Sequence, residues 1–233
     1  MFNNEDKMES KIQNLAKYID HTLLKPEASA AQIKKLCTEA NEYGFKSICI
    51  NPSRIEEAKK HLDPQRSMIC TVIGFPLGAM TTEAKAFETK DAIEKGASEI
   101  DMVLNIGKLK EGEIDYIKSD IAAVVAQAGE KTVKVIFETC LLNEKEIRLA
   151  TNTAIDAGAK FIKTSTGFSS SAATPEVVEI MLEEAQKRCE VKASGGVRSY
   201  EDAIKYIEMG VTRLGTSSGI AIMNGEKNTT SSY

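Results

Sequence analysis

Short apolar segments alternate with longer amphipathic segments along almost the whole chain. The short segments are rich in Ile, Val and Phe, as is typical of buried strands, whereas apolar residues three or four apart predict helices. In one helix Ser29 is a candidate N-cap, Ile33 and Leu36 share a face, and Gly44 ends the element. Eight strands separated by helices are predicted, at Tyr18–His21, Lys46–Ile50, Met68–Gly74, Glu99–Asn105, Val133–Thr139, around Lys163, around Lys192 and at Thr212–Thr216.

A helix, a glycine and then a strand recur along the chain, which forms a weak internal repeat. The glycines are Gly44, Gly96, Gly158 and Gly210. Repeated strand–helix units imply parallel strands joined by right-handed crossovers, and eight units most economically close into a (β/α)8 TIM barrel. An open doubly wound sheet is the alternative. No Gly-x-Gly-x-x-Gly motif follows the first strand, which disfavours both that sheet and a dinucleotide cofactor.

The chain is predicted to be one α/β domain with a short addition at each end. Residues 1–10 form a polar lead, residues 11–223 form the barrel, and residues 224–233 form a flexible, Ser/Thr-rich tail. A short helix is expected at Ser10–Lys17. With 233 residues, 42% of them hydrophobic, the chain has enough apolar material for one large core.

Charge and cysteine usage narrow the class of protein. A net charge of -4 gives no basic excess, which argues against nucleic acid or an anionic membrane as the main partner. No run is long and apolar enough to span a bilayer, and the polar start is unlike a signal peptide. The cysteines are odd in number and lack a Cys-x-x-Cys motif, which favours reduced thiols in a cytoplasmic protein. They are Cys37, Cys49, Cys70, Cys140 and Cys189.

Charged residues interrupt several predicted strands at positions that face into the barrel. The outward face of a barrel strand meets the helices and is apolar, whereas the inward face can carry chemistry. Such groups are either structural ion pairs or a catalytic cluster, and a lysine inside a strand is costly unless something uses it. The inward set predicted by alternation is Asp101, Lys134, Glu138, Lys163 and Lys192.

Two ammonium groups in a small volume cannot both stay protonated cheaply, so one loses its proton more readily. A free amine near neutral pH attacks aldehydes and ketones and gives an iminium ion, which can cleave or form the adjacent C–C bond without a metal. Asp101 could then move protons at the carbinolamine and enamine stages. Spacing alone leaves open whether Lys163 or Lys192 is the nucleophile.

A metal site is disfavoured, and no cofactor is expected. The chain has two histidines, His21 and His61, and neither lies in a His-x-His motif. No carboxylate cluster has the sequence spacing of a ligand set. A metal-dependent aldolase is therefore the less favoured alternative.

Glycine-rich loops after the last two strands suggest a phosphate site. They are Ser194–Ser199 and Leu214–Gly219, each lying between a strand and a helix, where backbone amides can hold an anion. Thr166 and Gly167, after the strand of Lys163, could offer a further amide from a neighbouring loop. One such loop would also be an ordinary turn, so the argument depends on finding two of them at these strands.

On these residues the chain resembles the deoxyribose-phosphate aldolase family. Members are class I aldolases, which are aldehyde-lyases that join acetaldehyde to glyceraldehyde 3-phosphate and reverse the step. The matching motifs run nearly end to end, at Tyr18–Pro26, Ser47–Pro52, Thr71–Gly78, Glu99–Asn105, Lys134–Thr139, Phe161–Phe168, Val191–Arg198 and Arg213–Gly219.

The resemblance implies a role for each matching residue. Lys163 would form the Schiff base, Lys192 would lie beside it, lower its pKa and share in proton transfer, and Asp101 would be the acid/base partner. Phe168 stands where some members carry a lysine, so no side-chain charge from that position is expected to hold phosphate. The phosphate would be bound, mostly through backbone amides, by Gly167, Gly195, Gly196, Gly215, Ser217 and Ser218.

Four further residues are candidates for accessory roles. Lys134 and Thr166 lie in the matching motifs, and Tyr233 fits the terminal tyrosine that members often carry, with its part in proton transfer left open. Cys49 is either the thiol best placed to react with aldehydes or a packed core residue.

The expected partners are a sugar phosphate and an aldehyde, with the oligomeric state open and a homodimer the form considered. Two other functions stay open at this point. One is a different class I aldolase or transaldolase with a longer ketose donor. The other is a non-catalytic sugar-phosphate-binding barrel, against which the intact set of Asp101, Lys163 and Lys192 argues.

Overall fold

Eight parallel strands close into one barrel, which confirms the (β/α)8 prediction and excludes the open sheet. The computed structural model describes residues 14–226. Neighbouring strands pair in chain order from β1 to β8, and β8 closes on β1 through Ile19 opposite Leu214. The strands are β1 (Ile19–Leu23), β2 (Ser47–Ile50), β3 (Met68–Ile73), β4 (Glu99–Val103), β5 (Thr132–Ile136), β6 (Phe161–Lys163), β7 (Glu190–Ser194) and β8 (Arg213–Thr216).

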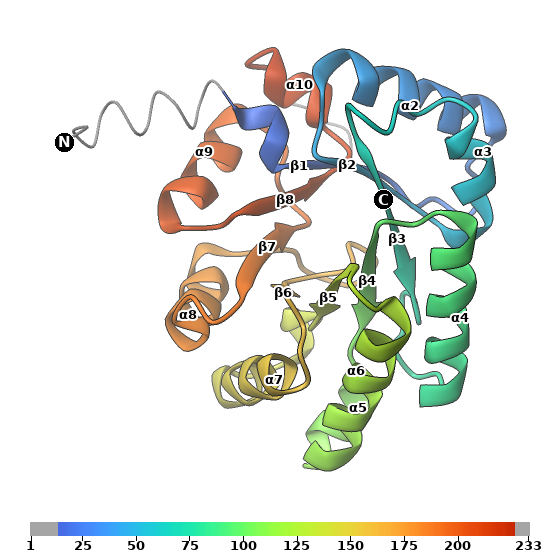
Figure 1. The fold of residues 1–233 in the computed structure, drawn as a ribbon. Helices are drawn as coiled ribbons and strands as arrows, with labels where there is room; N and C mark the ends of the chain where they lie inside the picture. The colour runs from blue at the N-terminus through green and yellow to red at the C-terminus, as the bar shows by residue number, and fades with distance from the viewer. Residues whose placement is uncertain (1–13, 227–233) are drawn as a thin grey trace.

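Helices surround the strands on the outside of the barrel (Figure 1). The α-helices are α2 (Ala30–Tyr43), α3 (Ile55–Lys59), α4 (Thr82–Lys95), α5 (Ile106–Lys110), α6 (Ile114–Ala128), α7 (Glu144–Asp156), α8 (Pro175–Ala185), α9 (Tyr200–Met209) and α10 (Gly219–Met223). Three short 3-10 helices complete the described part, η1 (Leu15–Tyr18), η2 (Pro52–Arg54) and η3 (Thr139–Leu141).

Capping residues fix the ends of several helices. Ser29 begins α2 with a reciprocal capping box to Gln32, and Gly44 ends it in the left-handed conformation at φ 67°. Asn143 forms the same box at α7, and Ser199 forms it at α9. These contacts satisfy backbone amides that a helix start otherwise leaves unpaired.

Two strands end well before the predicted residue, whereas β1 runs past its predicted end at His21 to Leu23. The strand predicted to reach Asn105 stops at Val103, because the Asn105 side chain accepts from the Lys108 amide and starts α5, a helix that the pattern does not predict. The strand predicted to reach Thr139 stops at Ile136, and Glu138 adopts a left-handed conformation at φ 53°.

Two predicted helices also differ from the structure. In the sequence, Asn51 and Pro52 predict the start of a helix that runs to about Leu62, but the structure splits it into η2 and α3 and ends it at Lys59. The helix expected at Ser10–Lys17 appears as η1, with the part before residue 14 outside the described residues. Because residues 1–13 and 227–233 lie outside the description, the division into lead, barrel and tail stays a prediction.

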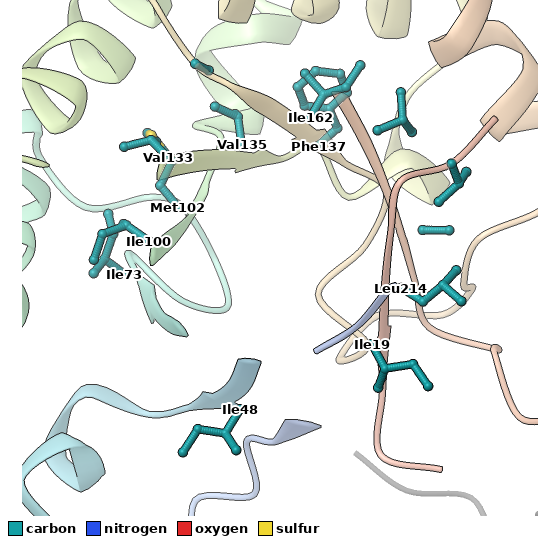
Figure 2. Packing of buried hydrophobic residues seen from close by; sticks show 14 of the residues in the cluster. Ile19, Ile48, Ile73, Ile100, Met102, Val133, Val135, Phe137, Ile162 and Leu214 are labelled. Carbon is teal, nitrogen blue, oxygen red and sulfur yellow. The ribbon is translucent and has the colours of Figure 1, made fainter. Parts of the chain in front are cut away.

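The main apolar core lies between the strands and the helices. Figure 2 shows outward-facing side chains from most of the strands, which pack in one buried cluster with the helix residues. Ile100, Ile162 and Val191, which alternation places outward, are all in this cluster. The predicted faces of β4, β6 and β7 are therefore confirmed, and the residues between these positions point into the barrel.

The barrel interior has an apolar part and a charged part. On the side of β2 and β3 a small apolar cluster contains Leu24, Cys49, Cys70 and Val72, with the partly buried Phe75 packed against it. The rest of the interior holds charged side chains from β1 and from β4 to β8. None of the helices in residues 14–226 has the length and apolar character needed to cross a membrane.

Candidate active site

Asp101 lies at the centre of the charged interior and contacts three lysines. Its Oδ2 accepts from the Nζ atoms of Lys163 and Lys192, each at 2.8 Å, and its Oδ1 accepts from Lys134 at 2.8 Å. Strand register explains the meeting, because Asp101 is paired with Lys134 and Lys163 with Lys192 on neighbouring strands. The thiol of Cys70 also donates to Asp101 Oδ1 at 3.1 Å.

The ion pairs that begin at Asp101 continue from residue to residue and return to Asp101, so they form a closed ring. Lys134 contacts Glu99 at 2.6 Å, and Glu99 contacts Arg213 at 2.7 Å. Arg213 contacts Asp20 at 2.9 Å, Asp20 accepts from Lys192, and Lys192 returns to Asp101. We call these six residues the charge ring. In order, they are Asp101, Lys134, Glu99, Arg213, Asp20 and Lys192.

Lys163 stands outside the charge ring and is bound to it at one point. Its only ionic contact with the described residues is to Asp101 Oδ2, an oxygen that it shares with Lys192. Each cation of the charge ring instead contacts two carboxylates within 3 Å. The Lys163 side chain is 4% exposed, whereas those of Lys134 and Lys192 are fully buried. Lys163 is therefore the least partnered amine of the three.

The electrostatic environment keeps the ring groups ionised. Burial alone would lower the pKa of Lys192, but Asp101 and Asp20 outweigh it and hold that pKa well above its usual value. Lys134 behaves in the same way, with Asp101 as the main attractive charge. Burial opposes the charge on Asp101, and the three lysines together hold its pKa well below the usual range.

This arrangement can carry out amine chemistry on a carbonyl compound. Lys192 stays a cation beside Lys163, and Asp101 touches both, so a proton has a short route between carboxylate and amine. An uncharged Lys163 would be a nucleophile next to a permanent positive charge and an ionised carboxylate. The sequence leaves the choice of lysine open, and the contacts favour Lys163.

Glu138 is placed differently from the other predicted inward charges. It does not join Asp101 and the lysines, because Thr166 donates to both its carboxylate oxygens, from the backbone amide at 3.2 Å and from the hydroxyl. The Phe168 amide in turn donates to the Thr166 hydroxyl at 3.0 Å. Glu138 and Thr166 therefore shape the loop after β6, and the expected convergence of all five charges is wrong for Glu138.

The predicted phosphate residues follow three neighbouring strands. Gly167 comes after β6, Gly195 and Gly196 after β7, and Ser217 and Ser218 after β8. Because β6, β7 and β8 are adjacent in the barrel, their carboxyl-end loops lie side by side. Gly167, Gly195 and Gly196 all have positive φ, between 76° and 88°, a conformation that L side chains rarely adopt.

Gly215 lies within β8 and faces the buried lysines. A Cβ atom there would lie 2.3 Å from Ser194 Oγ and 3.1 Å from Lys192 Cε, so no side chain fits. The Ser218 amide already donates to Thr216 Oγ1 at 2.9 Å. The predicted phosphate role of these residues stays a prediction that their placement allows.

Two buried hydroxyl groups near the lysines have no hydrogen-bond partner among the described residues. They belong to Ser165 and Ser194. Ser194 lies two positions after Lys192 on β7, so these two side chains share a face, and Ser165 follows the end of β6, two positions after Lys163. Buried hydroxyls normally have partners, which makes these two candidates for contact with a bound substrate.

The other accessory candidates have different outcomes. Cys49 is fully buried in the inner apolar cluster, and a hydrogen bond with Cys70 lowers its pKa against the opposing effect of burial. Its placement fits the packed-residue alternative, although its thiol also lies near the lysines. Tyr233 is outside the described residues, so its predicted part in proton transfer stays open.

Within the described part of the chain, two groups of buried side chains come close enough together to hold a metal ion. They are Cys49, Cys70 and Asp101, and Asp20, Cys70 and Glu99. Sequence spacing does not reveal them, because their members come from different strands. Every carboxylate in them already contacts a lysine or Arg213, so cations of the protein itself occupy the positions near these oxygens.

Three members of the charge ring are absent from the predicted site. Asp20 could have been found, since it is an acid between apolar neighbours within a strand, just as Asp101 is. Glu99 and Arg213 are the first residues of their strands, where a charge is ordinary. Only barrel closure brings them together across the interior.

Comparison with known proteins agrees with this geometry. Residues 14–225 match the family model described as DeoC/LacD family aldolase. The chain is 58% identical to the deoxyribose-phosphate aldolase of Streptococcus gordonii over 91% of this chain and 96% of that protein. A solved aldolase named QR15 has a TM-score of 0.88 and 40% identity, covering 91% of this chain and 95% of its own.

A solved deoxyribose-phosphate aldolase from Aeropyrum pernix, described as a unique tetramer, has a TM-score of 0.85 and 30% identity, covering 96% of this chain and 97% of its own. The family match spans the whole barrel, including every member of the charge ring. The chain belongs to the DeoC/LacD family of aldolases.

Proposed function

We propose that this protein is a deoxyribose-phosphate aldolase that cleaves 2-deoxy-D-ribose 5-phosphate reversibly through a Schiff base on Lys163. The relatives named deoxyribose-phosphate aldolase support the substrate. The observation that carries the mechanism is the contact of Lys163 and Lys192 with the same oxygen of Asp101. It gives a nucleophilic amine, a fixed cation and a proton carrier within hydrogen-bond distance.

The proposed reaction begins at the aldehyde carbon of the open-chain sugar. Neutral Lys163 adds through Nζ, its extra proton moves to the oxygen, and the carbinolamine loses water to give an iminium ion. Removal of the C3 hydroxyl proton then breaks the C2–C3 bond, and the electron pair moves toward the iminium nitrogen. Glyceraldehyde 3-phosphate leaves, and an enamine remains on Lys163.

Protonation of the enamine carbon and addition of water release acetaldehyde and restore the amine. Asp101 is the proposed proton carrier, because it touches both Lys163 and Lys192 in the same geometry. Lys192 is proposed to remain a cation that favours the neutral form of Lys163 and stabilises the negative charge that develops on oxygen. The two carboxylates that Lys192 contacts support this assignment.

The phosphate is proposed to lie over the ends of β6, β7 and β8. The positive-φ glycines in these loops support this proposal, because such backbone presents amide groups without side chains in the way. Phe168 at the loop after β6 contacts Phe75 edge to face, with ring centroids 5.3 Å apart. Phe75 follows β3 and Phe168 follows β6, three strands further around the barrel, so the two rings are proposed to cover part of the mouth.

Borohydride trapping tests the proposal directly. The protein is incubated with 2-deoxyribose 5-phosphate or acetaldehyde in the presence of a chelator, reduced, and digested for peptide mass mapping. We expect a reduced adduct on Lys163 that is absent from Lys163→Ala. An adduct on Lys192 would keep the reaction class and reverse the two lysines.

The alternative functions give other results in the same experiment. Trapping with dihydroxyacetone-type donors but not acetaldehyde would indicate another class I aldolase or a transaldolase. Binding of the sugar phosphate without any adduct would indicate a non-catalytic barrel.

The proposed partners are a sugar phosphate and an aldehyde, with a second copy of the chain forming a homodimer. Leu77, in the loop before α4, and Phe87, on α4, are 73% and 72% exposed, which supports an apolar contact between copies. We expect light scattering after size-exclusion chromatography to give twice the chain mass, falling when both residues are changed to serine. A single-chain mass for the unaltered protein would contradict the dimer.

We propose a cytoplasmic location for the same protein. Its cysteines are all free thiols in the structure, and Cys140 and Cys189 are partly exposed, which suits a reducing compartment. Cell fractionation with an antibody against the chain would test this, and recovery outside the cytoplasmic fraction would contradict it.

A further inference from the structure

The charge ring is electrically balanced. It contains three cations and three carboxylates in strict alternation, and every neighbouring pair is in ionic contact. Among residues 14–226, Lys163 is the one further cation attached to it, through Asp101. A balanced ring leaves no excess negative charge to hold the Lys163 ammonium, so the charge of the ring decides how readily that amine is freed.

Glu99 and Arg213 close the ring on the side away from Lys163. Arg213 forms two hydrogen bonds to the Glu99 carboxylate, at 2.7 and 3.1 Å. Its Cζ atom lies over the Phe161 ring, 5.2 Å from the ring centroid. Neither residue contacts Lys163 among the described residues, and both are at least 95% buried. Such a pair is costly to bury, and it is expected to persist where its charge or geometry is used.

We propose that Glu99 and Arg213 are positioning residues that set the pH range in which Lys163 can attack a carbonyl carbon. They do this in two ways: Glu99 holds Lys134 and Arg213 holds Asp20, which fix the two cations around Asp101, and together they keep the ring neutral. This inference rests on the proposed Schiff-base function of Lys163.

The groups that surround Lys163 come from most of the barrel strands. Glu138 lies nearer the mouth and is hydrogen-bonded to Thr166 rather than to a cation. The titratable and charged groups facing this part of the interior are Asp20 on β1, Cys49 on β2, Cys70 on β3, Glu99 and Asp101 on β4, Lys134 on β5, Glu138 after β5, Lys192 on β7 and Arg213 on β8.

Charge-changing variants separate this role from simple packing. Glu99→Gln leaves the ring with one excess positive charge, so Lys163 should lose its proton at lower pH. Arg213→Gln leaves one excess negative charge, so the proton should be held to higher pH. The double variant restores neutrality, since it removes one charge of each sign.

The measurement is the pH dependence of the rate at which acetaldehyde becomes trapped on Lys163. A unit charge at about 10 Å in an effective dielectric constant of about 20 shifts a pKa by about one unit. We therefore expect the acid limb of the Glu99→Gln profile to move down by about one pH unit, that of Arg213→Gln to move up by a similar amount, and that of the double variant to return close to the original.

Controls separate ring charge from other effects of substitution. Glu99→Asp and Arg213→Lys keep the charges and should keep the midpoint, whatever they do to the maximal rate. The exposed Glu201→Gln removes a surface charge on α9 and should leave the profile unchanged. Folded single variants whose midpoints move in the same direction, or not at all, would overturn the proposal.

A second measurement covers variants that do not fold. In the unaltered protein labelled with ¹⁵N-lysine, NMR should show the Lys163 signal titrating at lower pH than those of Lys134 and Lys192. If Lys192 or Lys134 titrates first, the inference is wrong, even where catalysis is normal. Absence of any adduct in the unaltered protein would instead remove the proposed function, while the titration order would still test the ring.

Discussion

Asp101 divides its two oxygens between different tasks. Oδ1 takes Lys134 and Cys70, which fix the orientation of the carboxylate, and Oδ2 takes the two lysines that face the proposed chemistry. A carboxylate held on one oxygen can exchange protons through the other without turning. The contacts of Oδ1 therefore hold Oδ2 in place for the proposed proton transfer.

Ser165 and Ser194 offer a test of substrate contact at the scale of single atoms. Their hydroxyls are buried and unpartnered among residues 14–226, so removing them breaks no hydrogen bond within the described protein. We expect Ser165→Ala and Ser194→Ala each to leave the free energy of unfolding unchanged or slightly raised. Each should raise KM for the sugar phosphate by about tenfold, since a hydrogen bond to a charged or polar ligand contributes about 1–3 kcal/mol.

The matched control for these variants is Ser29→Ala, a serine outside the proposed phosphate loops. Ser29 is the N-cap of α2 and accepts from the Gln32 amide, so this change should lower stability by about 1 kcal/mol and leave KM unaltered. Denaturant titration and steady-state kinetics measure both quantities. If Ser165→Ala and Ser194→Ala both destabilise the protein and leave KM unchanged, their hydroxyls are structural.

At the scale of elements, α4 and α6 are joined by an ion pair outside the barrel interior. Lys85 donates to Asp120 at 2.6 Å, both side chains are fully buried, and Thr82 donates to the other Asp120 oxygen at 2.9 Å. Burial lowers the pKa of Lys85 in spite of this partner. Each charge of this buried pair therefore needs the other to offset the free-energy cost of its removal from water.

Asp120→Ala should lower the free energy of unfolding by about 3–5 kcal/mol, because it leaves the Lys85 ammonium buried without a partner. Lys85→Met combined with Asp120→Leu should recover most of this loss. Urea unfolding measures both effects, and the trapping rate per folded molecule should stay unchanged. Equal losses in the single and double variants would mean that packing, not charge, is responsible. Glu94→Ala, in the exposed Lys90 pair, should change stability by less than about 1 kcal/mol.

The orientation of strand side chains could be predicted from the sequence, because it alternates with a period of two. The contacts that form only when the barrel closes could not be predicted. Alternation around Ile100 and Ile162 places Asp101 and Lys163 inside the barrel, because a strand turns successive side chains to opposite faces. Strand alternation gives no information on Lys85, a helix residue that is buried through its contact with Asp120 on α6. Glu99 and Arg213 lie far apart in the sequence and meet across the barrel interior, so no local sequence pattern reveals their contact.

At the scale of the whole molecule, the charge ring couples five strands. Its members come from β1, β4, β5, β7 and β8, including both strands at the point of closure. Loss of one ring charge therefore weakens contacts on both sides of the barrel at once. We expect such a loss to lower the stability of the whole barrel rather than to loosen one element.

Lowering the pH should remove charges from the ring by protonating Asp20 and Asp101. Burial opposes their charged forms, but the lysines and, for Asp20, Arg213 outweigh it, so both pKa values lie below the ordinary 3.8. The unfolded chain then takes up protons first as pH falls, so stability that is full above about pH 4 is lost below it. We expect Tm to be nearly level from about pH 7 to pH 5 and to fall steeply below pH 4.

Calorimetry at constant ionic strength measures this curve, and Asp20→Asn provides the comparison. That variant lacks one of the two ring carboxylates whose pKa is lowered, so its Tm should start lower at pH 7 and fall less between pH 4 and pH 2. A single heat-absorption peak should persist throughout, because the ring ties together strands from both sides of the barrel closure. A Tm that is level down to pH 2.5, or that falls as steeply in Asp20→Asn, would show that the ring carboxylates are not what acid removes.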